Sequence, residues 1–479
     1  MKRKIILSTL LAIILIGGIL LYLNLNNNIF VGKDMSEAKK YAEDHNYTLK
    51  INEKYSDSPY FEVISENKKS NNEYQINISK GIDYNGKTES DLKAITKDKS
   101  VADFKLLKNK EQMNKDIEKG KILEYDINLD KKEISYAISL GSDPITTKLK
   151  LAAVGDILIH DTIYNDAKVS GTYDFKPIFK DIKKQFSGHD LIYANQESLA
   201  GGAKLGLSSY PTFNSPHQIT DALDYLGVNM ISRANNHTLD AGEKGVLSAS
   251  KYYKRFDNII TAGSYSSQKE RDKISIIEKK GIKVGLLSYT YGFNGFQLPE
   301  KKEYLGNLFS NEQAKRDIDK AKKQADVVVV AMHWGNEYEP LPNLEQKKQA
   351  KFLNQQGVDI ILGSHPHVLE PVDFIKNKET KQETFVIYSL GNFLSAQDKR
   401  ERLTGLILSL DIDVTKSLDG TKVKVSNGKM MPTYNYANNG IRDYTIVPLK
   451  DFKGKPYYYD VKKLMTTYTK DIEFVNKLK

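Results

Sequence analysis

Imidazole, carboxylate and carboxamide side chains follow several of the apolar runs in this 479-residue sequence. These side chains belong to Asp156, His160, Asn195, Glu197, Asn235, Asn236, His237, His333, Glu337, His365, His367 and Asn392. The set contains five of the eight histidines of the chain. Neutral imidazole and carboxylate oxygens together suit Mn²⁺, Fe²⁺ or Zn²⁺, so a metal site is the chemistry that these residues predict.

The segment RANNHTLDAG shows why a ligand role is favoured over a structural one. Its three consecutive polar side chains would each need a partner if they were buried in an ordinary core. Taken singly, the other residues have simpler explanations. Asp156 could form a turn, His160 could lie on the surface, and Glu197 could cap the following segment. His365 and His367 could be plain loop residues. The recurrence of the same chemistry after several of the apolar runs is what argues for one shared site.

The apolar runs have the composition of β-strands, and helices are expected between several of them. The strand-like runs are LKLAAVG, LIYAN, VNMISRA, IITAG, KVGLLSYT, DVVVVAMHW, VDIILGSH and ETFVIYSLGN. Amphipathic helices are expected at 311–325 and 345–357, and antiparallel strands at 405–440. Runs of Val, Ile and Leu bounded by helices are typical of strands covered on both faces, so one large α/β domain is predicted. Ligands bind at the carboxyl ends of the strands in such sheets, where the polar clusters are expected to meet.

Residues 31–141 predict a different organisation, with a helix followed by three short strands in each of two stretches. In the first stretch, Ser36 is the expected N-cap, and Ala38, Tyr41 and Ala42 have helical spacing. Its strands are expected at TLKINEKY, FEVISEN and YQINISKG. In the second stretch the helix NGKTESDLKAI precedes FKLLKN, GKILEYDI and EISYAISLG.

The N-terminus predicts a membrane anchor. Lys2, Arg3 and Lys4 precede an uncharged stretch at 5–23, which would span roughly 28 Å as a helix. A cleavable signal peptide is the competing interpretation, but no small-x-small cleavage site follows the stretch. The basic residues keep the short N-terminal end in the cytoplasm, so a single-pass membrane protein with the bulk of its chain outside the cell is predicted.

Composition excludes several classes of function. The chain has no cysteine, which rules out disulfides, thiolate metal ligands and a cysteine nucleophile. It has no GxxxxGK[ST], GxGxxG or GxSxG pattern that would indicate a nucleotide or a serine-hydrolase site. The net charge of +10 is spread over the chain, which favours a solubilising surface over attraction to anionic wall polymer or lipid. Nucleic-acid binding is not predicted, because only this net charge would support it.

Motifs from AVGDILIHD to YSLGNF resemble the CapA family of capsule-synthesis proteins, also called the poly-γ-glutamate biosynthesis PgsA-type proteins. The resemblance rests on the motifs AVGDILIHD, NQES, RANNHTLDAG, YTYGFNG, HWGNEY, GSHPHVLEP and YSLGNF, which occur in the order of the family. This family is similar in fold to the calcineurin-like metallophosphoesterases. The resemblance therefore implies a β-sandwich flanked by helices, and a site for one or two divalent ions.

The resemblance also implies a role for each candidate residue. The implied metal ligands are Asp156, His160, Glu197, Asn236, His333, His365 and His367. Asn236 and His237 are the implied catalytic residues, with His237 as the acid for the leaving group. Asn195, Asn235, Asn294, Glu337 and Asn392 are expected to contact the substrate or support the ligands. Glu197 stands where the superfamily has an aspartate, and Phe293 replaces a smaller polar residue, so the number of metals stays open.

The two helix-and-strand stretches resemble PASTA repeats, the small extracellular modules of bacterial wall-associated proteins, although the second is degenerate. An unrelated α+β spacer is the alternative. The expected domains are a cytoplasmic N-terminus with a transmembrane signal anchor (1–29), two PASTA-like repeats (30–81 and 82–145), the CapA-type domain (146–450) and a C-terminal extension (451–479).

Three functions are consistent with these features. The first is a membrane-anchored protein that takes part in the biosynthesis or export of a poly-γ-glutamate-type capsule, with integral-membrane synthase and export subunits as partners. The second is an extracellular metal-dependent hydrolase of phosphoesters or related bonds in the cell envelope. The third is a non-catalytic scaffold that binds peptidoglycan or an anionic wall polymer through the repeats.

Overall fold

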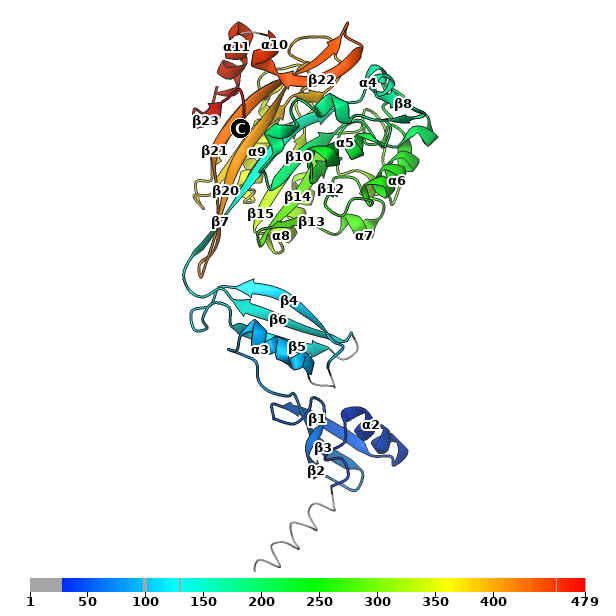
Figure 1. Ribbon diagram of the computed structural model, residues 1–479, viewed down its shortest axis with the longest axis vertical. Helices are drawn as coiled ribbons and strands as arrows, with labels where there is room; N and C mark the ends of the chain where they lie inside the picture. The colour runs from blue at the N-terminus through cyan, green and yellow to red at the C-terminus, as the bar shows by residue number, and fades with distance from the viewer. Residues whose placement is uncertain (1–27, 98–100, 129–130, 454, 479) are drawn as a thin grey trace, which may run out of the picture. The chain divides into compact units, whose positions relative to one another are not determined.

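The computed structural model describes residues 28–97, 101–128, 131–453 and 455–478 (Figure 1). It divides into two compact units. The first comprises Met1–Pro144 with Ser417–Asp419, and the second comprises Ile145–Lys416 with Gly420–Lys479. The expected membrane anchor at 5–23 lies outside the described residues. Within the described part of the chain, every helix is too short or too polar to span a bilayer.

The first unit contains the same arrangement twice, as the sequence predicts. The first copy consists of α2 (Met35–Asp44), β1 (Thr48–Lys54), β2 (Val63–Lys68) and β3 (Glu73–Ser79). The second consists of α3 (Glu89–Lys93), η1 (Ala94–Lys97), β4 (Lys105–Gln112), β5 (Ile122–Asn128) and β6 (Glu133–Ser139). In both copies the third strand lies in the middle, parallel to the first strand and antiparallel to the second. The prediction of a helix and three strands in each stretch is confirmed.

The expected cap of the first helix is wrong by two residues. Asp34, not Ser36, is the N-cap, and its carboxylate accepts a hydrogen bond of 2.9 Å from the Glu37 N–H. A carboxylate at the helix N-terminus satisfies a free N–H and also interacts favourably with the helix dipole. Ala38 and Ala42 are buried as the spacing predicts, and Tyr41 is partly buried.

The second unit is built on two β-sheets. The first sheet has the order β12-β11-β10-β7-β20-β21-β22, with β19 on β7 and β23 on β21. Its strands are β7 (Ile145–Ile157), β10 (Leu191–Gln196), β11 (Met230–Ser232), β12 (Ile260–Ala262), β19 (Asn392–Leu394), β20 (Thr404–Ser417), β21 (Gly420–Asn438), β22 (Arg442–Pro448) and β23 (Ile472–Phe474). The second sheet has the order β13-β14-β15-β16-β18-β17. Its strands are β13 (Ser275–Lys279), β14 (Ile282–Thr290), β15 (Val327–His333), β16 (Ile360–Ser364), β17 (Leu369–Lys376) and β18 (Glu383–Leu390).

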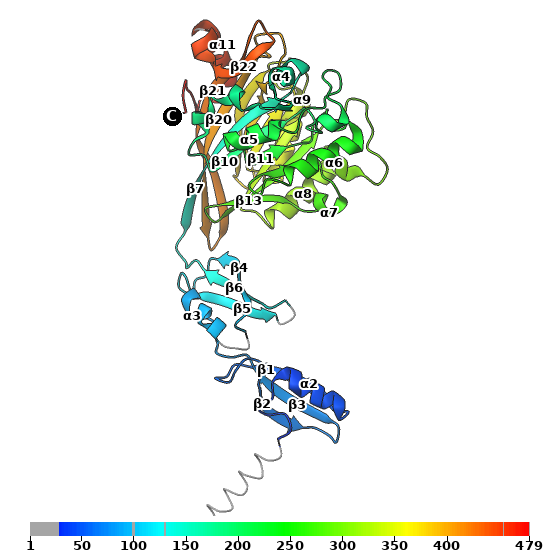
Figure 2. The ribbon, with the colours of Figure 1, turned by 45° about the vertical axis from the view of Figure 1, so that its right-hand side comes forward.

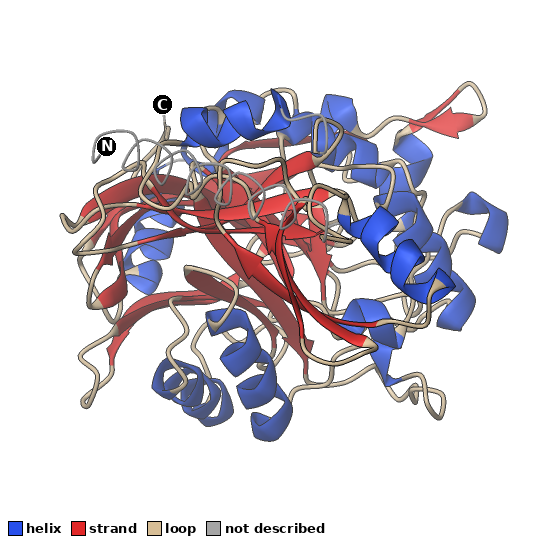
Figure 3. Cartoon of the chain, turned by 90° about the horizontal axis from the view of Figure 1, so that it is seen from below, coloured by secondary structure: helices blue, strands red, loops and turns tan. Residues whose placement is uncertain are grey.

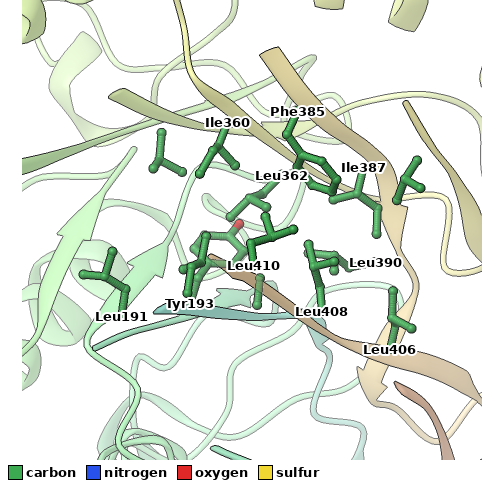
Figure 4. Close-up of a cluster of buried hydrophobic side chains, with 14 of the residues drawn as sticks. Leu191, Tyr193, Ile360, Leu362, Phe385, Ile387, Leu390, Leu406, Leu408 and Leu410 are labelled. Atoms are coloured by element: carbon green, nitrogen blue, oxygen red, sulfur yellow. The ribbon is translucent and has the colours of Figure 1, made fainter. Parts of the chain in front are cut away.

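The main hydrophobic core lies between the two sheets (Figure 4). Leu191 and Tyr193 of β10 belong to this core together with Leu362 of β16 and Phe385 of β18. The strands are therefore covered on both faces, as their continuous apolar sequences predict, but one face is covered by the other sheet rather than by helices. In Figure 3, helices of the second unit lie outside its strands.

Helices cover the outer faces of the sheets. Figures 1 and 2 show α5 (Ile219–Leu226) beside β10, and apolar side chains of α5 and α6 (Gly242–Tyr253) share a core with the first sheet. On the second sheet, α8 (Asn311–Lys322) and α9 (Leu344–Gln355) contribute to a third core. The remaining short helices of this unit are α4 (Asp161–Asp166), α7 (Gln268–Arg271), α10 (Leu449–Lys453) and α11 (Lys455–Met465).

A bulge in β7 sets the direction of Asp156. The pairing of β7 with β10 shifts by one residue, so that Gly155 is extra and Asn195 lies opposite Asp156. A Cβ atom on Gly155 would lie 1.9 Å from the Gly391 carbonyl oxygen, so only glycine allows this close approach. The sequence Gly-Asp at the end of the first strand therefore has a packing reason as well as a chemical one.

Residues 451–479 contribute to the main core of the second unit. Met465 of α11 and Ile472 of β23 are buried in it, and β23 pairs in parallel with β21. The Met465→Ala variant is expected to lower the free energy of unfolding by about 2–5 kcal/mol, because it leaves a cavity at a fully buried position. Tyr459→Ala on the same helix removes a side chain that is 58% exposed. This variant is expected to change the free energy of unfolding by about 0.5 kcal/mol at most. Chemical denaturation of both variants measures the difference, and equal losses would contradict the placement of α11.

Candidate metal centre

The ends of β7, β10, β15 and β16 bring the candidate ligands together. Asp156 is the next-to-last residue of β7, Glu197 follows β10, and His333 ends β15. His365 and His367 follow β16. These five side chains are all buried. β7 and β10 are parallel neighbours in the first sheet, and β15 and β16 are parallel neighbours in the second, so each pair ends at one edge of its own sheet.

The donor atoms form overlapping groups of three. Asp156, Glu197 and His367 form one group, and Glu197, His333 and His365 form another. Within each group the donor atoms lie within 4.8 Å of one another. Glu197 is common to both groups and is therefore the central carboxylate of the centre. A third group joins His365 and His367 to Glu337, which is exposed.

Glu197 is a buried carboxylate without a hydrogen-bond donor. Neither of its oxygens has a hydrogen-bond partner among the described residues. Its Oε1 lies 3.5 Å from His333 Nε2 and 3.6 Å from His367 Nε2. Burial raises the pKa of Glu197 well above its usual value, and the charge of Asp156 raises it further. A buried carboxylate is costly unless a cation or a proton balances it, so this geometry fits a bound cation.

His333 is oriented by a serine that the sequence analysis did not single out. Its Nδ1 lies 3.0 Å from the Ser364 hydroxyl, and its Nε2 lies 2.9 Å from Asn236 Oδ1. When the proton is on Nδ1, the Nε2 lone pair faces the oxygens of Asn236 and Glu197. Burial lowers the pKa of His333 well below its usual value, which favours the neutral ring. Three acceptors that face one another form a natural cation site.

His367 lies between the carboxylates of Asp156 and Glu197. Its Nδ1 is 2.9 Å from Asn392 Oδ1 and 3.4 Å from Asp156 Oδ2. Burial lowers the pKa of His367, but the charge of Glu197 and the contacts with Asp156 outweigh it and raise the pKa to about 10. Asn195 donates a 2.8 Å hydrogen bond to Asp156 and holds it in place. A proton on His367 thus balances the carboxylates when no metal does.

The His-Pro-His segment has a strained backbone. His365 and His367 have φ angles of +99° and +58°, which residues other than glycine rarely adopt. The Tyr338 N–H donates a 2.8 Å hydrogen bond to the Pro366 carbonyl and supports the segment. His365 Nδ1 has no hydrogen-bond partner in the described part of the chain, and burial lowers the pKa of His365 to about 3. This neutral imidazole is therefore available as a ligand, and strain of this kind is common where function dictates geometry.

The Asn-Asn-His turn contributes two differently placed residues. Asn235 braces the turn, because its side chain donates to the Gln196 carbonyl and accepts from the His237 N–H. His237 is not in any of the metal-ligand groups of the described residues. Its Nδ1 lies 2.7 Å from the carboxylate of Asp240, three residues later. Asp240 thus fixes the ring of His237 beside the centre.

The structure does not bring His160 into the ligand groups of the described residues. Its Nδ1 lies 3.1 Å from the Leu158 carbonyl, and its ring packs edge-on against Phe213. Burial lowers the pKa of His160 to about 4, so the ring is neutral. Asn294 accepts a 3.3 Å hydrogen bond from Asn236 and so supports a candidate ligand.

Sequence reasoning missed three residues that position or border the ligands. They are Ser364, Asp240 and Tyr291, whose ring lies 4.7 Å from that of His365. Asp240 could have been found from its spacing of three residues from His237. Ser364 is adjacent to His365 in the sequence, but its contact with His333 depends on the pairing of β15 with β16.

Loss of the Ser364 hydroxyl is expected to weaken metal binding without unfolding the protein. Ser364→Ala should reduce affinity for added Mn²⁺ by about 10–100-fold, the usual effect of removing a group that orients a ligand. Ser139→Ala removes another buried serine hydroxyl, in the first unit, and should leave the affinity unchanged. Calorimetric titration of both variants measures the effect. Equal affinities in the two would contradict the role given to Ser364.

The donor set suits a divalent cation. It offers imidazole nitrogens, carboxylate oxygens and the Asn236 carboxamide oxygen, and the chain has no thiol that would indicate a structural zinc site. The second unit is thus a two-sheet α/β protein whose strand ends carry a buried histidine and carboxylate centre compatible with a divalent metal ion.

The chain belongs to the family described as "Bacterial capsule synthesis protein PGA_cap", whose model matches residues 150–397, more than half of the chain. The "PGA biosynthesis protein CapA" of Bacillus subtilis (strain 168) is 30% identical over 252 residues, which are 52% of this chain and 64% of that protein. The chain thus matches less than two thirds of that relative's length. The "Capsule biosynthesis protein CapA" of Bacillus anthracis is 27% identical over 318 residues, which are 64% of this chain and 69% of that protein. The resemblance to the CapA family is confirmed.

Comparison with solved structures gives weaker likenesses. The NAD nucleotidase (NadN) of Haemophilus influenzae has a TM-score of 0.36 and 12% identity, covering 70% of this chain and 65% of that one. A hypothetical protein from Thermus thermophilus has a TM-score of 0.33 and 15% identity, covering 58% of this chain and 99% of that one. Neither likeness is close enough to bear on function.

Proposed function

We propose that this protein takes part in the biosynthesis or export of a poly-γ-glutamate-type capsule polymer as a membrane-anchored, extracellular component. The observation that carries the proposal is that the family match at 150–397 covers the residues that form the metal centre. The two named relatives, both described as CapA, support the same role. The apolar stretch at 5–23 anchors the chain, and integral-membrane synthase or export subunits are its partners.

The first unit lies in the sequence between the N-terminal apolar stretch and the second unit. Its two copies of one helix-and-strand arrangement are PASTA-like repeats, and this proposal rests on the motif in the sequence and on the shared strand order. The repeats act as spacers and contact peptidoglycan or an anionic wall polymer.

The metal centre is of the calcineurin-like metallophosphoesterase type, with one or two Mn²⁺, Fe²⁺ or Zn²⁺ ions. Asp156, Glu197, His333, His365 and His367 would hold the metal, which would supply activation of water and stabilisation of charge on a phosphoryl or carbonyl oxygen. This second candidate function, hydrolysis of phosphoesters or related bonds in the envelope, is favoured by that set of ligands.

His237 supplies the proton in the proposed reaction. Its Nδ1 lies 2.7 Å from the Asp240 carboxylate, which orients the ring. The Nε2–H of that ring then transfers its proton to the leaving group. Asn236, held by Asn294 and facing His333, orients the reacting group.

Deletion of the coding sequence in the producing bacterium tests the capsule role. Surface polymer is expected to fall strongly, and a copy of the gene carrying the wild-type sequence should restore it. A copy carrying His237→Ala then separates the two candidate functions, since failure to restore polymer would mean that the polymer pathway uses the proposed acid. Unchanged surface polymer after deletion would contradict the capsule role.

Turnover by the purified full chain tests the hydrolase role. With added Mn²⁺, hydrolysis of phosphomonoester or phosphodiester substrates is expected, and His237→Ala should reduce kcat by about 10²–10⁴-fold while metal content stays the same. Absence of turnover in a metal-loaded chain would contradict the hydrolase role and leave the capsule role to be judged by the deletion.

A further inference from the structure

A groove of about 850 Å³ lies at the edge of the second unit where strands of the second sheet begin. Val328 and Glu383 at the starts of β15 and β18 line it, together with Asp359 just before β16. The metal ligands follow the opposite, carboxyl ends of β15 and β16. The groove is therefore separate from the metal centre.

Five lysines give the groove its charge. They are Lys322, Lys376, Lys381, Lys422 and Lys424, from α8, β17, the turn after β17 and β21. Within the described residues, no carboxylate lies within 4.0 Å of any of these ammonium groups, although many other lysines of the chain form such pairs. Lys322 and Lys381 donate only to main-chain carbonyls. These ammonium groups are therefore available to an external anion.

The acidic residues of the groove do little to cancel this charge. Asp326 is already paired with Lys416 at 3.0 Å. Asp359 is buried and accepts hydrogen bonds from the Val328 N–H and from Gln382. Burial raises the pKa of Asp359 to about 7, so that it is partly protonated near neutral pH. Glu383 is the remaining carboxylate, and it is exposed.

Apolar side chains line the groove between the lysines. Phe374, Val423 and Val425 are partly buried and pack against the main core. Lysine acts as a point charge with little geometric demand, unlike the planar fork of arginine. A ligand with repeated negative charges separated by short apolar spacers satisfies both the cations and these apolar side chains.

We propose that this groove binds a flexible linear polyanion, namely a polycarboxylate chain with methylene spacers such as the polymer of the proposed capsule pathway. The assignment rests on the proposed function for the identity of the polymer. Polycarboxylates and polyphosphates share the anionic chemistry that lysines recognise, and the apolar residues favour the polycarboxylate. The groove then holds the polymer at the edge of the second sheet opposite the metal centre.

Charge reversal in the groove tests the proposal in the full chain. Labelled poly-γ-glutamate of defined length is the probe, and K422E/K424E is the variant. The control, K244E/K251E, makes the same change of charge at exposed lysines of α6, outside the groove. The groove variant is expected to bind at least about tenfold more weakly and to lose about two units of the slope of log Kd against log salt, since two cations no longer contact the polymer. The control should bind within about twofold of wild type.

Three results would overturn the proposal. They are no binding by the wild-type chain, no selective loss of binding in K422E/K424E relative to the control, and tight binding of inorganic polyphosphate with no binding of poly-γ-glutamate. Metal content and surface polymer in the complemented deletion strain are measured in parallel. If K422E/K424E binds poly-γ-glutamate normally while deletion of the coding sequence removes surface polymer, the groove proposal alone is overturned. If deletion leaves surface polymer unchanged, the capsule role alone is overturned.

Discussion

Replacing Glu197 with glutamine is expected to reduce affinity for added Mn²⁺ by more than about 100-fold, because Glu197 is shared by both groups of ligands. The same change should not lower the melting temperature of the metal-free protein. Glutamine keeps the shape of the side chain and removes a buried carboxylate whose two oxygens have no hydrogen-bond donor among the described residues. Loss of metal affinity without loss of stability would identify Glu197 as a metal ligand rather than a core residue.

Glu370→Gln is the matched control for this experiment. Glu370 is also fully buried, and burial raises its pKa to about 8, but its carboxylate accepts a 2.7 Å hydrogen bond from Gln346. It belongs to none of the ligand groups in the described part of the chain, so its substitution should leave metal content unchanged. Elemental analysis measures the metal content of both variants, and a thermal melt measures their stability. A Glu197→Gln protein that keeps its metal and melts lower would contradict the ligand role.

Metal affinity is expected to rise steeply between pH 6 and pH 8. In the metal-free folded chain the pKa of His367 is raised to about 10, and burial raises that of Glu197 well above its usual value. The charge of Glu197 is a main cause of the raised pKa of His367, so the pair holds at least one proton near neutral pH, and a metal ion must displace it. Each displaced proton contributes a factor of about ten in affinity per pH unit, so at least about tenfold per unit is expected.

The other histidines of the centre do not add to this dependence. The pKa of His365 is lowered to about 3 and that of His333 is well below its usual value, so both are already neutral at pH 6. Calorimetric titration in two buffers with different protonation enthalpies counts the protons released, and one to two per chain are expected. An affinity that stays constant from pH 6 to pH 8 would mean that neither Glu197 nor His367 binds the metal.

The sequence predicts the strands and the edge of the sheet where the ligands meet, because both follow from local patterns. The apolar run at Val327–His333 is long enough to be a buried strand, and His333 at its end must lie at the carboxyl edge. The stacking of two sheets was implied by family resemblance rather than by periodicity. An apolar strand face has the same sequence whether a helix or another sheet covers it.

The details of the centre depend on contacts that no local pattern encodes. Ser364 reaches His333 only because β15 and β16 are neighbours in register. The positive φ angles of the His-Pro-His segment follow no local sequence rule, and His160 contacts the Leu158 carbonyl through Nδ1 and lies outside the ligand groups of the described residues. The Asp34 cap was missed because both Asp34 and Ser36 are residue types that cap helices.

Anomalous diffraction from crystals of the protein grown with Mn²⁺ tests the metal centre most directly. A peak is expected between Glu197, His333 and His365, with a second peak between Asp156, Glu197 and His367 if two ions bind. Each ion should lie within coordination distance of its nitrogen and oxygen ligands. Peaks found only at exposed carboxylates, with the Glu197 carboxylate and the neighbouring imidazoles free of metal, would contradict the assignment.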